Sequence, residues 1–154
     1  MDVANILKPE AVKCVSAVSS KKRLFHELGD LATLAYGLKS SDVASALQER
    51  ESLGPTGVGQ GVALPHARLP GLEKVCGLFI QIERPLEFES VDKQPVDLVF
   101  ALLAPEDAGV EHLKALAVVS RSMRNTGLCT KLRANSDAVT VHTLLSEQHR
   151  DQAA

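Results

Sequence analysis

Residues 96–104 read Val96-Asp97-Leu98-Val99-Phe100-Ala101-Leu102-Leu103-Ala104, a run in which Asp97 is the single polar residue. An apolar run of this length, with no turn residue inside it, is typical of a strand that is covered on both faces. The run therefore predicts the central strand of a sheet. The segments on either side of it determine how the sheet is covered.

A short helical segment over residues 1–9, which Pro9 ends, and two longer helices are predicted upstream of this strand. The first of the longer helices begins after a cap at Ser19 or Ser20 and ends before Gly37, with leucines at helical spacing between them. The second runs from about Ser40 to Ser52. Downstream, three further helices are predicted, and their approximate spans are 105–123, 125–134 and 137–148.

Shorter strands are predicted around the central run. Residues 12–18 are rich in valine and small residues, residues 62–64 form a short apolar run that Pro65 ends, and residues 75–82 are apolar except for Gln81. Leu86 and Phe88 alternate with acidic residues, which predicts an edge strand. The glycine-rich residues 54–61 are expected to be loop. Helices on both sides of a mixed sheet give an α/β fold.

The length of 154 residues is that of one domain, and we expect a single unit over 1–154. Its core should span about 3–147, and residues 148–154 should be a frayed tail. A formal charge of −2 provides no broad basic surface, so a nucleic-acid partner is not expected. No apolar stretch is long enough to span a bilayer, and the N-terminus lacks a signal-peptide pattern. A cytoplasmic location follows as an expectation.

Several chemistries fit the sequence poorly. The glycine-rich segment lacks the Gly-Lys-Ser/Thr ending of a Walker loop, and Val62 stands where a dinucleotide fingerprint needs its third glycine. The three cysteines are widely spaced without a CxxC pair, and no two histidines form a local pair, so no metal site is predicted. There is no Gly-x-Ser-x-Gly motif for a serine hydrolase. No cofactor is expected.

A histidine phosphoryl carrier fits better. A neutral imidazole is a nucleophile, and a phosphorylated one needs a nearby cation and hydrogen-bond donors. His66 follows the glycines, Arg50 lies on the inward face of the preceding helix, and His112 lies near the start of the helix after the central strand. Taken singly, Arg50 also fits a salt bridge at a helix end, and His112 also fits a capping or surface histidine.

The stretch from Arg50 to Arg68 (RESLGPTGVGQGVALPHAR) resembles the signature of the mannitol/fructose-type enzyme IIA domains of the bacterial phosphotransferase system. The segment QPVDLVFALLAP over 94–105, and His112-Leu113 at a helix start, agree with it. Within that family the chain is most similar to the nitrogen-related enzyme IIA, because it stands alone without IIB or IIC segments.

The resemblance implies a roughly five-stranded mixed sheet flanked by helices on both faces. It implies that His66 accepts a phosphoryl group on Nε2 and that Arg50 and His112 stabilise that group. It also implies binding roles in the loop, carried by Thr56, Gly57, Gly59 and Gly61.

The implied donor is a histidine-phosphorylated phosphocarrier protein, and the implied targets are partners such as potassium transporters or sensor kinases. No membrane insertion is implied. Two alternatives remain open from the sequence. One is a free-standing fructose or mannitol enzyme IIA that passes its phosphate to a IIB domain. The other is a non-catalytic regulatory binding module.

Overall fold

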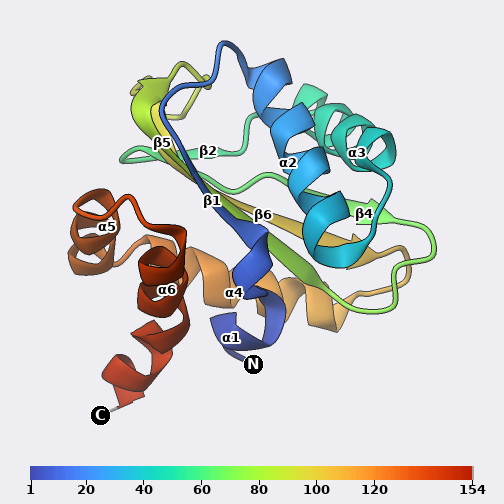
Figure 1. Ribbon diagram of the computed structural model, residues 1–154. Coiled ribbons are helices and arrows are strands. Elements are labelled where there is room, and N and C mark those ends of the chain that lie inside the picture. The colour runs from blue at the N-terminus through green and yellow to red at the C-terminus, as the bar shows by residue number, and fades with distance from the viewer. Residues whose placement is uncertain (154) are drawn as a thin grey trace.

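The computed structural model describes the backbone of residues 1–153 and the side chains of residues 1–147. The helices pack around one sheet (Figure 1). The helices are α1 (Val3–Ile6), the 3₁₀ turn η1 (Pro9–Ala11), α2 (Lys21–Tyr36), α3 (Ser40–Ser52), α4 (Val110–Met123), α5 (Thr126–Arg133) and α6 (Ala138–Ala153). The strands are β1 (Val12–Val15), β2 (Gly57–Gly59), β3 (Val62–Ala63), β4 (His66–Leu69), β5 (Cys76–Leu86) and β6 (Val96–Pro105).

The sheet is built on β6, as the apolar run predicts. Its strands follow the order β1-β5-β6-β3-β2, and β4 also pairs with β6. β5 runs antiparallel to β6, whereas β3 and β4 run parallel to it. β3 lies beside Leu98 and Val99, and β4 lies beside residues 102–105, so the two short strands follow one another along the same edge of β6.

The α/β class and the mixed sheet with helices on both faces are confirmed. In Figure 1, α2 and α3 lie on one side of the sheet, and α1, α4, α5 and α6 lie on the other. Within the described residues the sheet has six strands, one more than expected, and an interruption at Leu64-Pro65 divides the edge beside β6 into β3 and β4. Proline has no N–H to give to a ladder, which explains the interruption.

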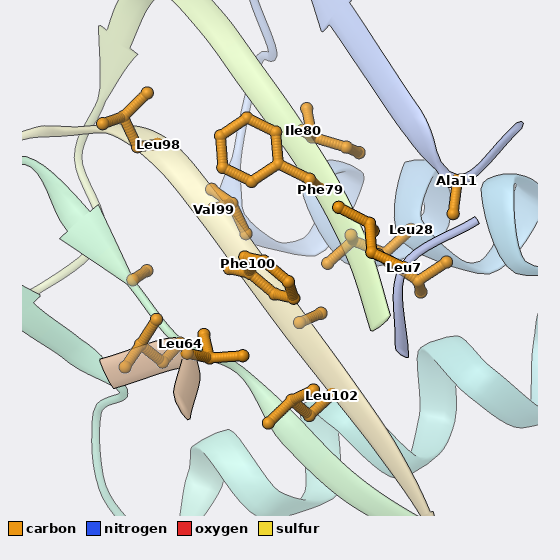
Figure 2. Close-up of a cluster of buried hydrophobic side chains, with 14 of the residues drawn as sticks. Leu7, Ala11, Leu28, Leu64, Phe79, Ile80, Leu98, Val99, Phe100 and Leu102 are labelled. Carbon is orange, nitrogen blue, oxygen red and sulfur yellow. The ribbon is translucent and has the colours of Figure 1, made fainter. Parts of the chain in front are cut away.

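The core lies on both faces of β5 and β6. Phe79 and Phe100 pack edge to face with their ring centroids 5.9 Å apart, and both rings are fully buried. Leu98, Val99 and Leu102 continue the apolar row along β6 (Figure 2). A β6 buried on both sides places the residues beside it on the most rigid part of the molecule.

The predicted helix ends are largely confirmed. The Ser20 side chain accepts a hydrogen bond from the Arg23 N–H, which caps α2, and α2 ends at Gly37 with a φ of 71°. Asn125 caps α5 in the same way, through the Leu128 N–H. α4 starts at Val110 rather than at Pro105, because the residues between them form a turn.

Three strand predictions were wrong. The glycine-rich segment, expected to be loop, contains β2, and His66 begins β4, a strand that was not predicted. β5 continues to Leu86 with an irregularity after Gln81, so residues 86–89 are not a separate edge strand, and Phe88 is fully buried. Glycine and proline are poor strand formers, and pairing along β6 overrides that local preference here.

α6 is traced to Ala153, beyond the expected end at residue 148. A frayed tail was expected over residues 148–154. The side chains of these residues, and the whole of residue 154, lie outside the described part of the chain. No helix among the described residues is both long enough and apolar enough to cross a membrane.

Tyr36 fixes the N-terminal segment to the sheet. Its hydroxyl lies 3.1 Å from the Ile6 carbonyl and 2.8 Å from the Gly77 carbonyl, and it accepts a hydrogen bond from the Lys8 N–H. Burial of the hydroxyl raises the pKa of Tyr36 to about 12. One side chain at the end of α2 therefore holds α1 against β5.

Candidate functional site

His66 is the first residue of β4 and lies opposite Leu102 of β6. Its Nδ1 lies 3.0 Å from the Leu64 carbonyl oxygen, which is free because the strand is interrupted at Pro65. A carbonyl only accepts, so Nδ1 carries the proton of the neutral ring and Nε2 keeps its lone pair. The sheet therefore holds a half-buried imidazole with Nε2 as its nucleophilic nitrogen.

His112 lies in the first turn of α4 and is only 7% exposed. Its ring packs edge to face against the His66 ring, with the centroids 5.7 Å apart. Burial lowers the pKa of His112, and electrostatic interactions with the neighbouring His66 and Arg68 lower it further. The ring is therefore neutral near pH 7.

The two nitrogens of His112 are placed differently. Nδ1 is buried and has no hydrogen-bond partner among the described residues. A buried N–H without an acceptor is rarer than a buried lone pair without a donor, so we assign the proton to Nε2. His112 then offers an Nε2–H donor beside His66.

Arg50 lies in the last turn of α3, half-buried as its spacing predicts. Its Nη1 donates to the Gly54 carbonyl oxygen at 3.1 Å. Within the described residues it forms no ion pair with a carboxylate, so the salt bridge that a lone arginine would suggest is not present. Most of its donors are left for another acceptor.

These three residues meet in one cavity of about 540 Å³ at the β4 edge of the sheet, between α3 and α4. The polar and charged residues of its lining are His66, His112, Arg50, Arg68 and Glu49. The apolar residues of the lining are Ala46, Leu53, Ala67, Leu113 and Leu116, of which Leu53 and Leu113 are mostly exposed. An imidazole nucleophile, an imidazole donor and unpaired cations suit the transfer of an anionic group.

Thr56 does not line this cavity. It is 5% exposed, and its backbone N–H and hydroxyl both donate to the carboxylate of Glu51, at 2.9 and 2.5 Å. Lys21 forms an ion pair with the same carboxylate at 2.9 Å. This buried cluster fixes the start of the glycine segment to α2 and α3. Its binding role stays a prediction.

The predicted glycines also lie outside the lining. A side chain at Gly57 would collide with Ser90, and one at Gly61 would lie 2.5 Å from Arg133 Nη2. Gly59 has a φ of 101° and packs beside Asp92. These contacts give each glycine a structural reason. The binding roles expected for Gly57, Gly59 and Gly61 stay predictions.

Sequence reasoning did not assign a role to Arg68 or to the cluster around Glu51. Arg68 shares a face with His66 only because 66–69 is a strand, and the alternation His66, Ala67, Arg68 is the signal that would have shown it. In the described part of the chain, no group of three or more His, Cys, Asp or Glu is gathered that could hold a metal ion.

The chain is similar to known proteins along nearly its whole length. The family described as "Phosphoenolpyruvate-dependent sugar phosphotransferase system, EIIA 2" matches residues 5–148. A nitrogen regulatory protein of Bradyrhizobium diazoefficiens is 47% identical over 146 residues, covering 95% of this chain and 95% of that protein. A fructose-specific EIIA component of Haloferax volcanii is 31% identical over 147 residues, covering 95% of this chain and 96% of that protein.

A solved structure shares the fold of this chain. The nitrogen regulatory protein IIA-Ntr from Neisseria meningitidis superimposes with a TM-score of 0.85 at 38% identity. The match covers 93% of this chain and 98% of that one.

Proposed function

Because this chain belongs to the EIIA 2 family of the phosphoenolpyruvate-dependent sugar phosphotransferase system, we propose that it carries a phosphoryl group on Nε2 of His66. The family assignment expected from the sequence is confirmed, and with it a role in phosphoryl transfer. The phosphohistidine and its residues are our proposal. The donor is a phosphocarrier protein that bears its own phosphohistidine.

The contact between His66 Nδ1 and the Leu64 carbonyl carries the assignment. The Nε2 lone pair forms a bond to phosphorus while the bond from phosphorus to the donor imidazole breaks. The electron pair of the broken bond stays on the donor ring, whose other nitrogen is protonated. The His66 ring becomes positively charged, and the Leu64 carbonyl stabilises its Nδ1–H.

Arg50 and His112 serve the phosphoryl group in this mechanism. The Arg50 guanidinium contributes positive charge and donors, and the Nε2–H of neutral His112 donates to a phosphoryl oxygen. Little else is required, because positioning and charge compensation account for most of the catalysis of phosphoryl transfer. The lowered pKa of His112 supports this role, since a cationic His112 would repel the positive ring of phosphorylated His66.

The output that we propose is regulatory. The relative with 47% identity is named a nitrogen regulatory protein, whereas the fructose-specific relative has 31% identity. The phosphorylation state of His66 would then control binding to partners such as sensor kinases or potassium transporters. Leu53 and Leu113, mostly exposed beside the cavity, suit a protein partner, because exposed apolar groups around a polar centre are typical of docking surfaces.

The test is a labelling reaction with phosphoenolpyruvate, enzyme I and the phosphocarrier, read by intact mass. We expect the wild-type protein to gain one phosphoryl group and His66→Ala to gain none, with both unfolding at the same urea concentration. A labelled His66→Ala protein would contradict the assignment. His26→Ala is the matched control, because His26 is exposed on α2 and should leave labelling unchanged.

A second measurement separates the regulatory proposal from its alternatives. Labelled protein is mixed with candidate IIB domains, and transfer of the label to one of them would indicate a sugar-transport enzyme IIA. Affinity capture with unlabelled and labelled protein tests the binding module. Equal partner binding by the labelled and unlabelled protein would indicate a non-catalytic module.

A further inference from the structure

We propose that Arg68 is a second cation of the phosphoryl site, contacting the transferred phosphoryl group from β4, whereas Arg50 contacts it from α3. The proposal rests on the proposed function of His66. It adds a residue to which neither the family match nor the resemblance assigns a role. Three features of the structure support it: the position of Arg68 on β4, its hydrogen bonds and the charge of the cavity.

The first feature is the strand. β4 pairs with β6 so that His66 lies opposite Leu102 and Arg68 lies opposite Ala104. Side chains two residues apart on a strand point to the same face, and Ala67 between them is buried on the other. Arg68 therefore extends beside His66, and both line the same cavity.

The second feature is how the guanidinium is held. Arg68 Nη1 donates to the Glu106 carbonyl oxygen at 3.1 Å, in the turn that leads into α4. Arg50 on α3 is held in the same way, because its Nη1 donates to the Gly54 carbonyl oxygen. Neither arginine forms an ion pair among the described residues, so each keeps donors for an anion.

The third feature is the charge of the lining. Glu49 is the one carboxylate among the lining residues, and it offsets one arginine. Without Arg68, the positive charge of Arg50 and the negative charge of Glu49 would cancel. With it, the lining has a net positive charge. A phosphoryl group on a side chain carries a charge of about −1.5 to −2 near neutral pH. Arg50 alone, with its charge cancelled by Glu49, would leave that negative charge without compensation.

The strand and the hydrogen bond also make Arg68 less mobile than an ordinary surface arginine. The backbone of β4 is fixed by β6, and the Glu106 contact restricts the side chain. Its charge already reaches the site, because it contributes to the lowered pKa of His112. The donors that remain are thus placed before the phosphoryl group arrives, which reduces the reorganisation needed during transfer.

The experiment compares Arg68→Met and Arg68→Lys in single-turnover transfer from the phosphorylated phosphocarrier to His66. Loss of one charge-assisted contact at an exposed site should slow Arg68→Met by about tenfold. Arg68→Lys keeps the charge but is too short to keep the same carbonyl contact, so it should retain most of the rate. Arg121→Met is the control, because Arg121 is exposed about 14 Å further along α4 than His112.

The outcomes distinguish an electrostatic role of Arg68 from a structural role in holding the turn at Glu106. If Arg68→Met transfers at the wild-type rate, the proposal is wrong. If Arg68→Lys and Arg68→Met slow equally, Arg68 acts only by holding the turn at Glu106, and the proposal is also wrong. A slow Arg68→Met with a nearly normal Arg68→Lys supports it, provided that Arg121→Met is unchanged.

A second readout does not need transfer at all. Inorganic phosphate is titrated into each protein while the imidazole NMR signals of His66 and His112 are followed. We expect Arg68→Met to bind phosphate about tenfold more weakly than wild type, and equal affinities would overturn the proposal. If wild-type His66 is never labelled, the proposed function fails, while the phosphate titration still decides whether Arg68 belongs to an anion site.

Discussion

The two ends of β6 carry two charged regions that are built in opposite ways. Near the start of the strand, Arg133 holds the Asp97 carboxylate through Nε and Nη2, both at 2.9 Å, and also donates to the Gln60 carbonyl at 2.8 Å. About 20 Å along the strand, Arg50 and Arg68 lie beside two histidines without a carboxylate partner in the described residues.

This difference in charge pairing indicates that the first region serves the stability of the fold and the second serves the site. The Asp97–Arg133 pair has its charges matched within the protein, and it ties α5 to the segment around Gly61. The cavity around His66 keeps positive charge unmatched, which suits an anion that arrives from outside. Substitutions at the first region should therefore change stability, and substitutions at the second should change transfer.

The largest effect is expected at Arg50. Arg50→Met should slow labelling of His66 by about 10- to 100-fold, because a charge-assisted hydrogen bond is worth about 1.5–3 kcal/mol. The rate is measured by rapid quench with phosphorylated carrier in excess. The urea midpoint should stay at the wild-type value. Wild-type labelling with an unchanged phosphoryl lifetime would remove Arg50 from the site.

Gly61→Ala should disturb the Asp97–Arg133 region by changing the backbone beside it. Gly61 has a φ of 80°, and an added Cβ would lie 2.5 Å from Arg133 Nη2 and 2.8 Å from Asp97 Oδ1. We expect a loss of about 2–3 kcal/mol in the free energy of unfolding, measured in urea. Gly54→Ala is the control, since its Cβ would meet nothing within 4 Å. Equal stability of the two variants would show that the contact at Gly61 does not matter.

Arg133→Met should cost about 1–2 kcal/mol of stability and leave labelling of His66 unchanged. The expected loss of stability is modest because the Arg133 side chain is 37% exposed. A double-mutant cycle with Asp97→Asn measures the coupling. Strictly additive losses, or slowed labelling, would contradict the division between the two ends of β6.

The smallest effect is expected from the pH dependence of His112. Its pKa in the folded protein is lowered, so its contribution to stability is complete above the unfolded pKa of about 6.5. That contribution is lost as the pH falls from 6.5 through the lowered value. His112→Gln should therefore narrow the difference between urea midpoints at pH 7.5 and pH 5.5. An unchanged difference would show that His112 titrates normally.

The parts of the fold predicted from sequence are those with local signals. β6 is long and apolar, α2 has a serine cap and a terminal glycine, and the inward position of Arg50 follows from helical spacing alone. β2 contains two glycines, and β4 directly follows Pro65, so neither has the local pattern of a strand. Both become strands only through pairing with other strands. Local patterns do not contain that pairing.

The candidate site divides in the same way. His66, Arg50 and His112 were predicted because each lies next to a recognisable feature of the sequence, and the structure brings all three into one cavity. Arg68 and the Lys21–Glu51–Thr56 cluster depend on contacts between separate elements. Their importance became visible only when α2, α3 and β4 were placed together.

The contacts of Tyr36 have an optical consequence. The chain has no tryptophan and a single tyrosine, so Tyr36 dominates its near-ultraviolet absorption and its intrinsic fluorescence. Because its hydroxyl is bonded between α1 and β5, unfolding must change the signal of this one chromophore. Its pKa of about 12 keeps the phenol un-ionised across the pH range of the experiments above. The protein thus contains its own label-free reporter of folding, remote in sequence from His66.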